Sequence, residues 1–166
     1  MAKKKESFLD AAVEIGASLL IGYVISRFVK IAISRGDSML PTIKNNQLII
    51  MDCRAYKRRE PKRHDLIAFK SHQKKGHKIF LKRVIGLPGD HILFENGKIY
   101  LNHQILSEPY IKESMRLSRK SQWIVESGTL FVMGDNRNQS LDSRSKSLGL
   151  VSVENDVVGV VMKVIF

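Results

Sequence analysis

The sequence contains a single cysteine, Cys53, among 166 residues. One thiol excludes an internal disulfide, and no group of cysteines and histidines has the spacing of a zinc site. A free cysteine is usually buried, so we expect Cys53 to serve as a small hydrophobic side chain. We therefore expect neither a metal nor a cofactor, and any chemistry must come from ordinary side chains.

Acidic residues are scarce: 16 Asp and Glu stand against 28 Lys and Arg, which gives a net charge of +12. Such a surplus suggests a polyanionic neighbour, either nucleic acid or anionic lipid headgroups. The densest basic stretch, residues 54–63, has only Tyr56 to stack on bases and matches no nucleic-acid-binding pattern, so we expect no nucleic acid partner. A solvated loop and a loop facing anionic lipid remain the alternatives. The basic residues of this stretch are Arg54, Lys57, Arg58, Arg59, Lys62 and Arg63.

Long uncharged apolar runs are also few. The run at residues 15–26 is too short to cross a hydrocarbon core of about 30 Å alone, but residues 11–28 give a plausible span, with Glu14 and Arg27 near the two interfaces. No small-residue cleavage site follows it, which argues against a removed signal peptide. The alternative is an amphipathic or core helix; we expect a single transmembrane anchor at residues 8–33, after a short cytoplasmic lead at 1–7. Basic residues on both sides leave its orientation undecided.

After residue 42 the sequence becomes a series of short β-forming runs separated by turn residues. The clearest hairpin joins residues 91–94 to 98–101 through Asn96 and Gly97, a pair that favours a type I′ turn. Asn102 and His103 form a second turn, and the polar segment 113–120 is expected to be an exposed loop. We expect residues 34–166 to form one mainly β domain, an antiparallel barrel-like or sandwich-like unit. The other expected strands are residues 47–51, 65–69, 78–85, 129–133 and 157–166.

Candidate chemistry is concentrated in three stretches: residues 36–42 (GDSMLPT), 81–90 (LKRVIGLPGD) and 134–144 (GDNRNQSLDSR). The first contains Ser38, whose hydroxyl needs a base to become a useful nucleophile. None of the five histidines lies in a recognisable triad context, and there is no Gly-x-Ser-x-Gly elbow. The second stretch offers Lys82 as the base, provided that its amine is neutral at the working pH.

The neighbours of Lys82 supply a way to make its amine neutral. Alternate residues of a strand share a face, so Lys82 would lie between Phe80 and Val84. If that face is inward, loss of water lowers the lysine pKa; if it faces solvent, Lys82 is an ordinary lysine. Arg83 would then point the opposite way, toward a carboxylate.

The three stretches, in this order after an apolar N-terminal segment, resemble the motif boxes of bacterial type I signal peptidases, in particular the compact members of Gram-positive type. The resemblance extends from the anchor to Arg144. It implies that Ser38 is the acylating nucleophile and Lys82 the general base. The supporting residues that it implies are Met39 in the substrate pocket, Ser140 as the hydrogen-bonding partner that orients the lysine amine, and Asp142, Arg144 and Arg83 as structural braces, with Gly134 and Asp135 in a turn.

One position departs from part of that family. Some members carry a hydroxyl residue two positions before the nucleophile, where it helps to stabilise the oxyanion. Gly36 occupies that position here, as glycine does elsewhere in the family. The oxyanion would then be held mainly by backbone N–H groups, that of Ser38 first among them.

The resemblance implies a membrane-bound serine endopeptidase. Its substrates would be secreted precursors cut after small residues of Ala-x-Ala type, through an acyl-enzyme. The protein would be a monomer in the cell membrane, with a single span and its catalytic domain on the extracellular side, where it meets anionic lipids.

Other readings of the same sequence stay open. A related Ser/Lys peptidase could process pilin or conjugation substrates. A self-cleaving repressor would need a DNA-binding domain and an Ala-Gly bond before the serine, and the sequence has neither. A pilus-assembly chaperone of the same fold should lack Ser38 or Lys82. A nucleic-acid-binding module explains the charge of +12 but leaves the three stretches without a role.

Overall fold

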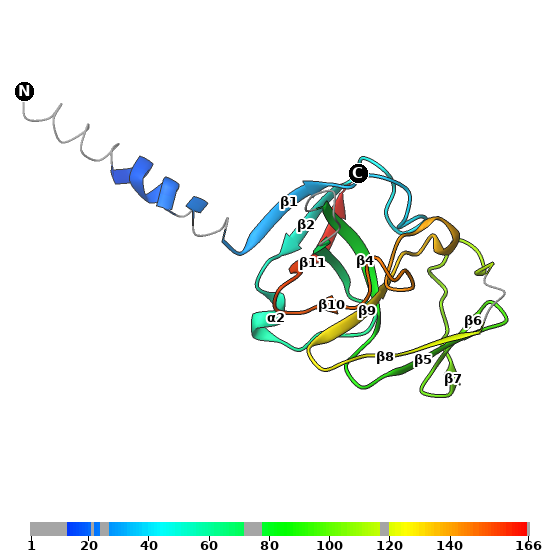
Figure 1. Ribbon diagram of the computed structural model, residues 1–166. Coiled ribbons are helices and arrows are strands. Elements are labelled where there is room, and N and C mark those ends of the chain that lie inside the picture. The colour runs from blue at the N-terminus through cyan, green and yellow to red at the C-terminus, as the bar shows by residue number, and fades with distance from the viewer. Residues whose placement is uncertain (1–12, 21, 24–26, 72–77, 117–119, 166) are drawn as a thin grey trace, which may run out of the picture.

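The computed structural model describes residues 13–20, 22–23, 27–71, 78–116 and 120–165. The domain is built around two antiparallel sheets (Figure 1). The larger sheet has the strand order β1-β2-β11-β3-β4-β9-β10. Its strands are β1 (Val29–Ile33), β2 (Leu48–Asp52), β3 (Leu66–Ser71), β4 (Lys78–Gly86), β9 (Thr129–Met133), β10 (Val151–Ser152) and β11 (Val157–Ile165).

The smaller sheet has the strand order β7-β6-β5-β8. Its hairpin turns at Asn96 and Gly97, which have φ values of 50° and 72°, the left-handed conformation that a type I′ turn requires. Asn102 and His103 also have positive φ and lead into β7. Both predicted turns are therefore confirmed. The strands are β5 (His91–Glu95), β6 (Lys98–Leu101), β7 (Gln104–Ile105) and β8 (Ser121–Ile124).

The prediction of a mainly β, antiparallel domain is confirmed by these pairings. Within the described residues neither sheet closes on itself: β1 and β10 are the edges of the larger sheet, and β7 and β8 those of the smaller. The barrel-like form of the prediction is therefore corrected. Alternation of apolar residues predicts strands well, but it does not reveal whether the first and last strands meet.

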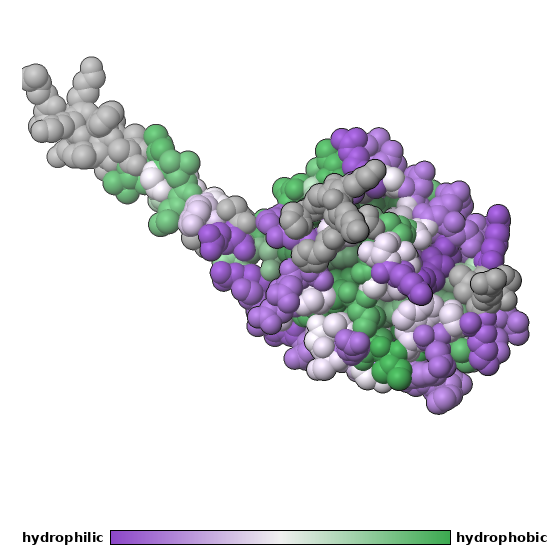
Figure 2. Space-filling view, in the orientation of Figure 1, coloured by the Kyte–Doolittle hydropathy of each residue, from purple (hydrophilic) through white to green (hydrophobic). Residues whose placement is uncertain are grey.

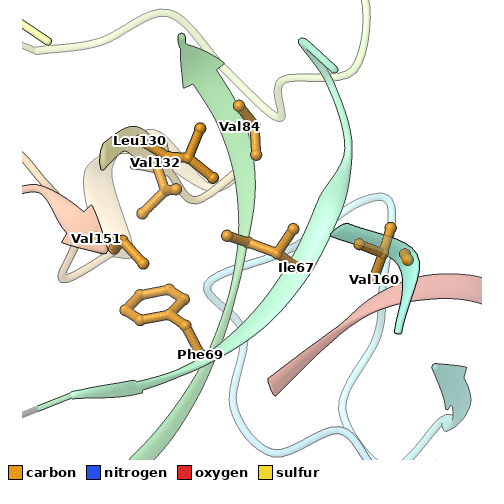
Figure 3. Packing of buried hydrophobic residues seen from close by; sticks show 8 residues of the cluster. Ile67, Phe69, Val84, Leu130, Val132, Val151 and Val160 are labelled. Carbon is orange, nitrogen blue, oxygen red and sulfur yellow. The ribbon is translucent and has the colours of Figure 1, made fainter. Parts of the chain in front are cut away.

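Buried aliphatic and aromatic side chains hold the larger sheet together. In one cluster, residues from β3, β4 and β9 pack against β10 and β11 (Figure 3). Burial of each such side chain contributes roughly 1.5–3 kcal/mol relative to exposure. The labelled members are Ile67, Phe69, Val84, Leu130, Val132, Val151 and Val160.

The basic stretch at residues 54–63 contains a single helical turn, α2 (Ala55–Arg58), where the sequence suggested a loop. Several of its cations have structural partners. Arg58 pairs with Asp52, Arg59 with Asp65 at 2.8 Å, and Arg63 with Asp90 at 2.9 Å. Much of this charge is therefore neutralised within the fold.

The N-terminal segment is helical at residues 13–20 and 22–23 and extends away from the β domain (Figure 1). No helix of the described residues has the length and hydropathy needed to span a bilayer. Residues 8–12, 21 and 24–26 of the expected anchor lie outside the described residues. Its last part is corrected, because Val29–Ile33 forms β1 and pairs with β2. The β-branched Val29, Ile31 and Ile33 alternate there, as suits a strand.

Candidate active site

Ser38 lies on the loop that follows β1, and the next residues fasten this loop to the core. Met39 and Ile43 are 3% and 1% exposed and pack with side chains of β2 and β3. Gly36 has a φ of +86°, and its N–H donates to Asn45 Oδ1 at 3.0 Å. Ser38 itself is half-buried, which leaves its hydroxyl at the surface of an anchored loop.

Lys82 reaches this hydroxyl from β4. Its side chain is only 1% exposed, so the strand face that carries it points inward. The Lys82 amine donates to Ser38 Oγ at 2.7 Å and to the Leu81 carbonyl at 2.9 Å. The structure thus brings the candidate nucleophile and the candidate base into direct contact.

The surroundings of the Lys82 amine favour its neutral form. Burial lowers its pKa from the ordinary value of 10.5 to about 8, while the negative charges of Asp142 and Asp135 act in the opposite direction. Loss of water exceeds the attraction of the two carboxylates here. The amine is therefore half unprotonated near pH 8, and the neutral form is the one that a general base requires.

The third stretch begins where β9 ends and packs against the Ser38 main chain. Asn136 N–H donates to the Ser38 carbonyl at 3.0 Å, and Asn136 Nδ2 donates to the Asp37 carbonyl at 3.1 Å. A Cβ added at Gly134 would lie 2.5 Å from the Ser38 carbonyl oxygen and 2.6 Å from Ser140 Cβ. Gly134 is therefore needed for a close approach, a role that the turn assigned to it from sequence did not include.

Ser140 lies close to Ser38 and Lys82, but it does not make the expected hydrogen bond to the Lys82 amine. Its Oγ packs on Gly134 and is buried, with no hydrogen-bond partner among the described residues. The hydrogen bonds of the Lys82 amine go to Ser38 and to the Leu81 carbonyl. In this structure the lysine is thus oriented by its neighbour in sequence and by the serine, without Ser140.

Asp142 and Arg144 form a two-point ion pair. Arg144 Nε and Nη2 donate to the Asp142 carboxylate at 2.8 and 2.9 Å, and Asp142 also accepts from the Gly134 N–H at 3.1 Å. Asp142 is 1% exposed, so its charge acts on Lys82 through the protein interior. The pair fixes the two ends of the third stretch to each other.

Arg83 points away from Lys82 and meets the carboxylate of Asp135. Its Nε and Nη2 donate to the two oxygens at 2.8 and 2.6 Å, and Asp135 also accepts from the Thr42 hydroxyl. Asp135 thus joins all three stretches, although sequence reasoning gave it only a turn. Sequence analysis gave Thr42 no role either, although its place within the first stretch could have indicated that it belongs to the site.

A cleft of about 610 Å³ opens beside Ser38 and Lys82. Among the described residues, no group of three or more His, Cys, Asp or Glu side chains is placed to hold a metal ion. The cleft lining is mainly apolar: Ala32, Ile33, Met39, Ile43, Ile49, Met51, Ala68, Ile79, Phe80, Leu81 and Leu141 contribute to it. Such a cleft suits an extended apolar ligand.

Comparisons with known proteins point to one family. The family described as "Signal peptidase, peptidase S26" matches residues 9–166. Signal peptidase I U of Bacillus subtilis strain 168 is 39% identical over an alignment of 140 positions, which covers 80% of this chain and 73% of that protein. Signal peptidase I of Bacillus caldolyticus is 34% identical over an alignment of 150 positions, which covers 82% of this chain and 77% of that protein.

A signal peptidase I from Enterococcus faecalis V583, solved as a crystal structure, is 32% identical and superposes with a TM-score of 0.51. The superposition covers 61% of this chain and 97% of that chain. Since the family pattern and relatives above 30% identity both span most of the sequence, this chain belongs to the signal peptidase family, peptidase S26.

Proposed function

We propose that this peptidase removes signal peptides from secreted precursors after small residues, with Ser38 as the nucleophile and Lys82 as the general base. The observation that carries the proposal is the 2.7 Å contact between the Lys82 amine and Ser38 Oγ, at a lysine whose pKa burial lowers to about 8. Family membership supplies the reaction class, and this contact supplies the chemistry.

The reaction would run in two halves. The neutral Lys82 amine accepts the Ser38 proton as Oγ attacks the scissile carbonyl, and the resulting ammonium gives that proton to the leaving amine. The signal peptide is then held as an ester on Ser38. Lys82 next removes a proton from water as the water oxygen attacks the ester carbonyl. The Lys82 ammonium returns that proton to Ser38 Oγ when the acyl–oxygen bond breaks, which releases the signal peptide with a free carboxylate and restores both residues. With Gly36 two positions earlier, the oxyanion would be stabilised by backbone N–H groups, principally that of Ser38.

The open edge of β4 offers a seat for the precursor. Within the described residues, β4 pairs only with β3 from Lys78 to Lys82, and its pairing with β9 begins at Arg83. An extended peptide can add to such an edge by main-chain hydrogen bonds, with alternate side chains entering the cleft. Met39 lines the cleft next to Ser38, and we propose that it limits the side chains accepted beside the scissile bond to small ones.

The membrane assignment rests on surface chemistry. Ile33, Ile79 and Leu141 line the cleft and are 54%, 64% and 38% exposed, so its rim could rest on apolar lipid. Figure 2 shows further apolar side chains on the described part of the N-terminal helix. We propose that this N-terminal segment anchors the chain once, with residues 1–7 inside and the catalytic domain on the extracellular side. Anionic headgroups would meet exposed lysines such as Lys30, which lies next to this segment.

Cleavage of a purified secretory precursor by the full-length chain tests the function. Ser38→Ala and Lys82→Ala should each lower the rate by on the order of a thousandfold or more. Turnover of the Lys82→Ala variant at the wild-type rate would remove Lys82 from the mechanism. Absence of any cleavage by the wild-type chain, at acidic or basic pH, would contradict the proposal.

A further inference from the structure

The connection between β7 and β8 lies along the outer side of the third stretch. We call its residues 107–116 the strap. Lys112 N–H donates to the Asp135 carbonyl at 3.2 Å, and Arg116 N–H donates to Asn138 Oδ1 at 2.9 Å. The described part of the segment 113–120 has no helix or strand, and Ser114, Arg116 and Lys120 are exposed, so the expected exposed loop is confirmed there; residues 117–119 lie outside the described residues. Met115 is the exception, because it is 6% exposed and packs in the core. The strap is therefore a loop that is fastened to the residues that position Ser38.

The strongest contact of the strap is a buried ion pair. Arg137 Nη1 and Nη2 donate to the two carboxylate oxygens of Glu108, each at 2.6 Å. The side chain of Arg137 is fully buried and that of Glu108 is 8% exposed. A two-point pair of this kind fixes both the position and the plane of the guanidinium.

The same guanidinium also holds the start of the third stretch. Arg137 Nε donates to the Gly134 carbonyl at 3.0 Å. Gly134 packs directly on the Ser38 carbonyl, which itself accepts from Asn136 N–H. A continuous series of contacts therefore leads from Glu108 through Arg137 and Gly134 to the main chain of the nucleophile.

Tyr110 strengthens this connection from the side. Its hydroxyl donates to Glu108 at 3.1 Å. Its ring lies against the Arg83 guanidinium, 4.0 Å from the ring centroid, with Arg137 at 5.9 Å. Arg83 follows Lys82 in β4, so Tyr110 contacts the residue next to the base while Glu108 acts on the stretch next to the nucleophile.

We propose that Glu108 is a positioning residue for the peptidase reaction and that Tyr110 assists it. Glu108 holds Arg137, and through the Gly134 carbonyl it keeps the third stretch pressed on Ser38, so that Ser38 Oγ stays within reach of the Lys82 amine. This inference rests on the proposed function. It also assigns a purpose to the smaller sheet, which carries the strap to the active site.

Hydrogen exchange tests the series of contacts from Glu108 to Ser38 without a substrate. In Glu108→Gln, protection of the Gly134 and Asn136 amides should fall at least tenfold, because Arg137 loses its charged partner. Amides in β3 should keep their protection. Glu95→Gln is the matched control, since Glu95 is a half-exposed residue of the smaller sheet that pairs with Lys120. Unchanged protection at Gly134 and Asn136 in Glu108→Gln would overturn the inference, whether or not the wild-type chain cleaves precursors.

Kinetics then separate positioning from simple loss of stability. At a temperature well below the Tm of the variant, Glu108→Gln should lower kcat at least tenfold and leave KM within about twofold of the wild type. A wild-type kcat per folded molecule would overturn the inference while the proposed function stood. If Glu108→Gln does not fold, Tyr110→Phe serves instead, with about threefold changes in protection and kcat; no change in either would count against the proposal. Failure of the proposed function has its own signature, which is no difference between the wild type and Ser38→Ala.

Discussion

The Lys82 amine and the Ser38 hydroxyl lie 2.7 Å apart although 44 positions separate them in the sequence. One is supplied by the interior face of β4 and the other by a loop anchored in the core. Lys82 is buried, so its amine loses its proton more easily. Ser38 is half-buried, so its hydroxyl can be reached from the cleft. The first two predictions follow from this environment.

The rate of cleavage should rise with pH through about 8. Burial lowers the Lys82 pKa to about 8, and only the neutral amine can accept the Ser38 proton. Below that pH, kcat/KM should fall about tenfold for each pH unit. A profile that stays flat between pH 6 and 8 would show that another group is the base.

Lys82→Met should be inactive and yet more stable than the wild type at pH 7, by on the order of 2 kcal/mol, because a charged amine is no longer buried. The gain should shrink as pH rises from about 8 toward 10.5. In that range the folded wild type has a neutral amine while its unfolded chain is still protonated, so wild-type stability rises with pH. Urea titrations of both proteins at pH 7 and pH 10 measure the two differences; a constant difference would contradict this explanation.

Asp142→Asn should lower the midpoint of the pH–rate profile below that of the wild type. The carboxylate of Asp142 raises the Lys82 pKa, and its loss also leaves Arg144 without its ionic partner. Both changes disfavour the protonated amine. Glu154→Gln is the control: it removes one negative charge, as Asp142→Asn does, but at an exposed position, and it should leave the midpoint unchanged. An upward shift in Asp142→Asn would contradict the electrostatic account.

Gly134→Ala should destabilise the fold by about 1–3 kcal/mol and lower kcat, because the new methyl group collides with backbone that cannot move freely. Gly16→Ala is the matched control, since a Cβ at that position has no neighbour within 4 Å. Thermal unfolding and cleavage rates of both variants provide the comparison. Wild-type behaviour of Gly134→Ala would show that the close packing on Ser38 is not required.

Sequence reasoning succeeded where the determinants are local. The Asn96-Gly97 turn follows from backbone preference. Strand alternation likewise predicts that Lys82 and Arg83 point to opposite faces, whereas only the structure shows that the face of Lys82 is the inward one. It failed at the end of the expected anchor, because apolar β-branched residues such as those of β1 suit a helix in lipid as well as a strand.

The remaining differences depend on tertiary contacts. Nothing near Glu108 in the sequence indicates that its partner is Arg137, which lies 29 positions away. Likewise, the charge of residues 54–63 looked free, although Arg63 pairs with Asp90, 27 positions away, and Arg59 with the nearby Asp65. Motif spacing predicts which residues matter, whereas packing decides what each of them touches.

The change of partners along β4 has a consequence for where a substrate would be cut. A peptide that lies along the free half of β4 meets the end of β9 at Arg83, one residue beyond Lys82. The backbone itself would then act as a stop, and the bond presented to Ser38 would be fixed by the distance to that stop. A longer β9 would leave a shorter free part of β4 for the substrate peptide. The position of the cleaved bond would then depend on where β9 ends.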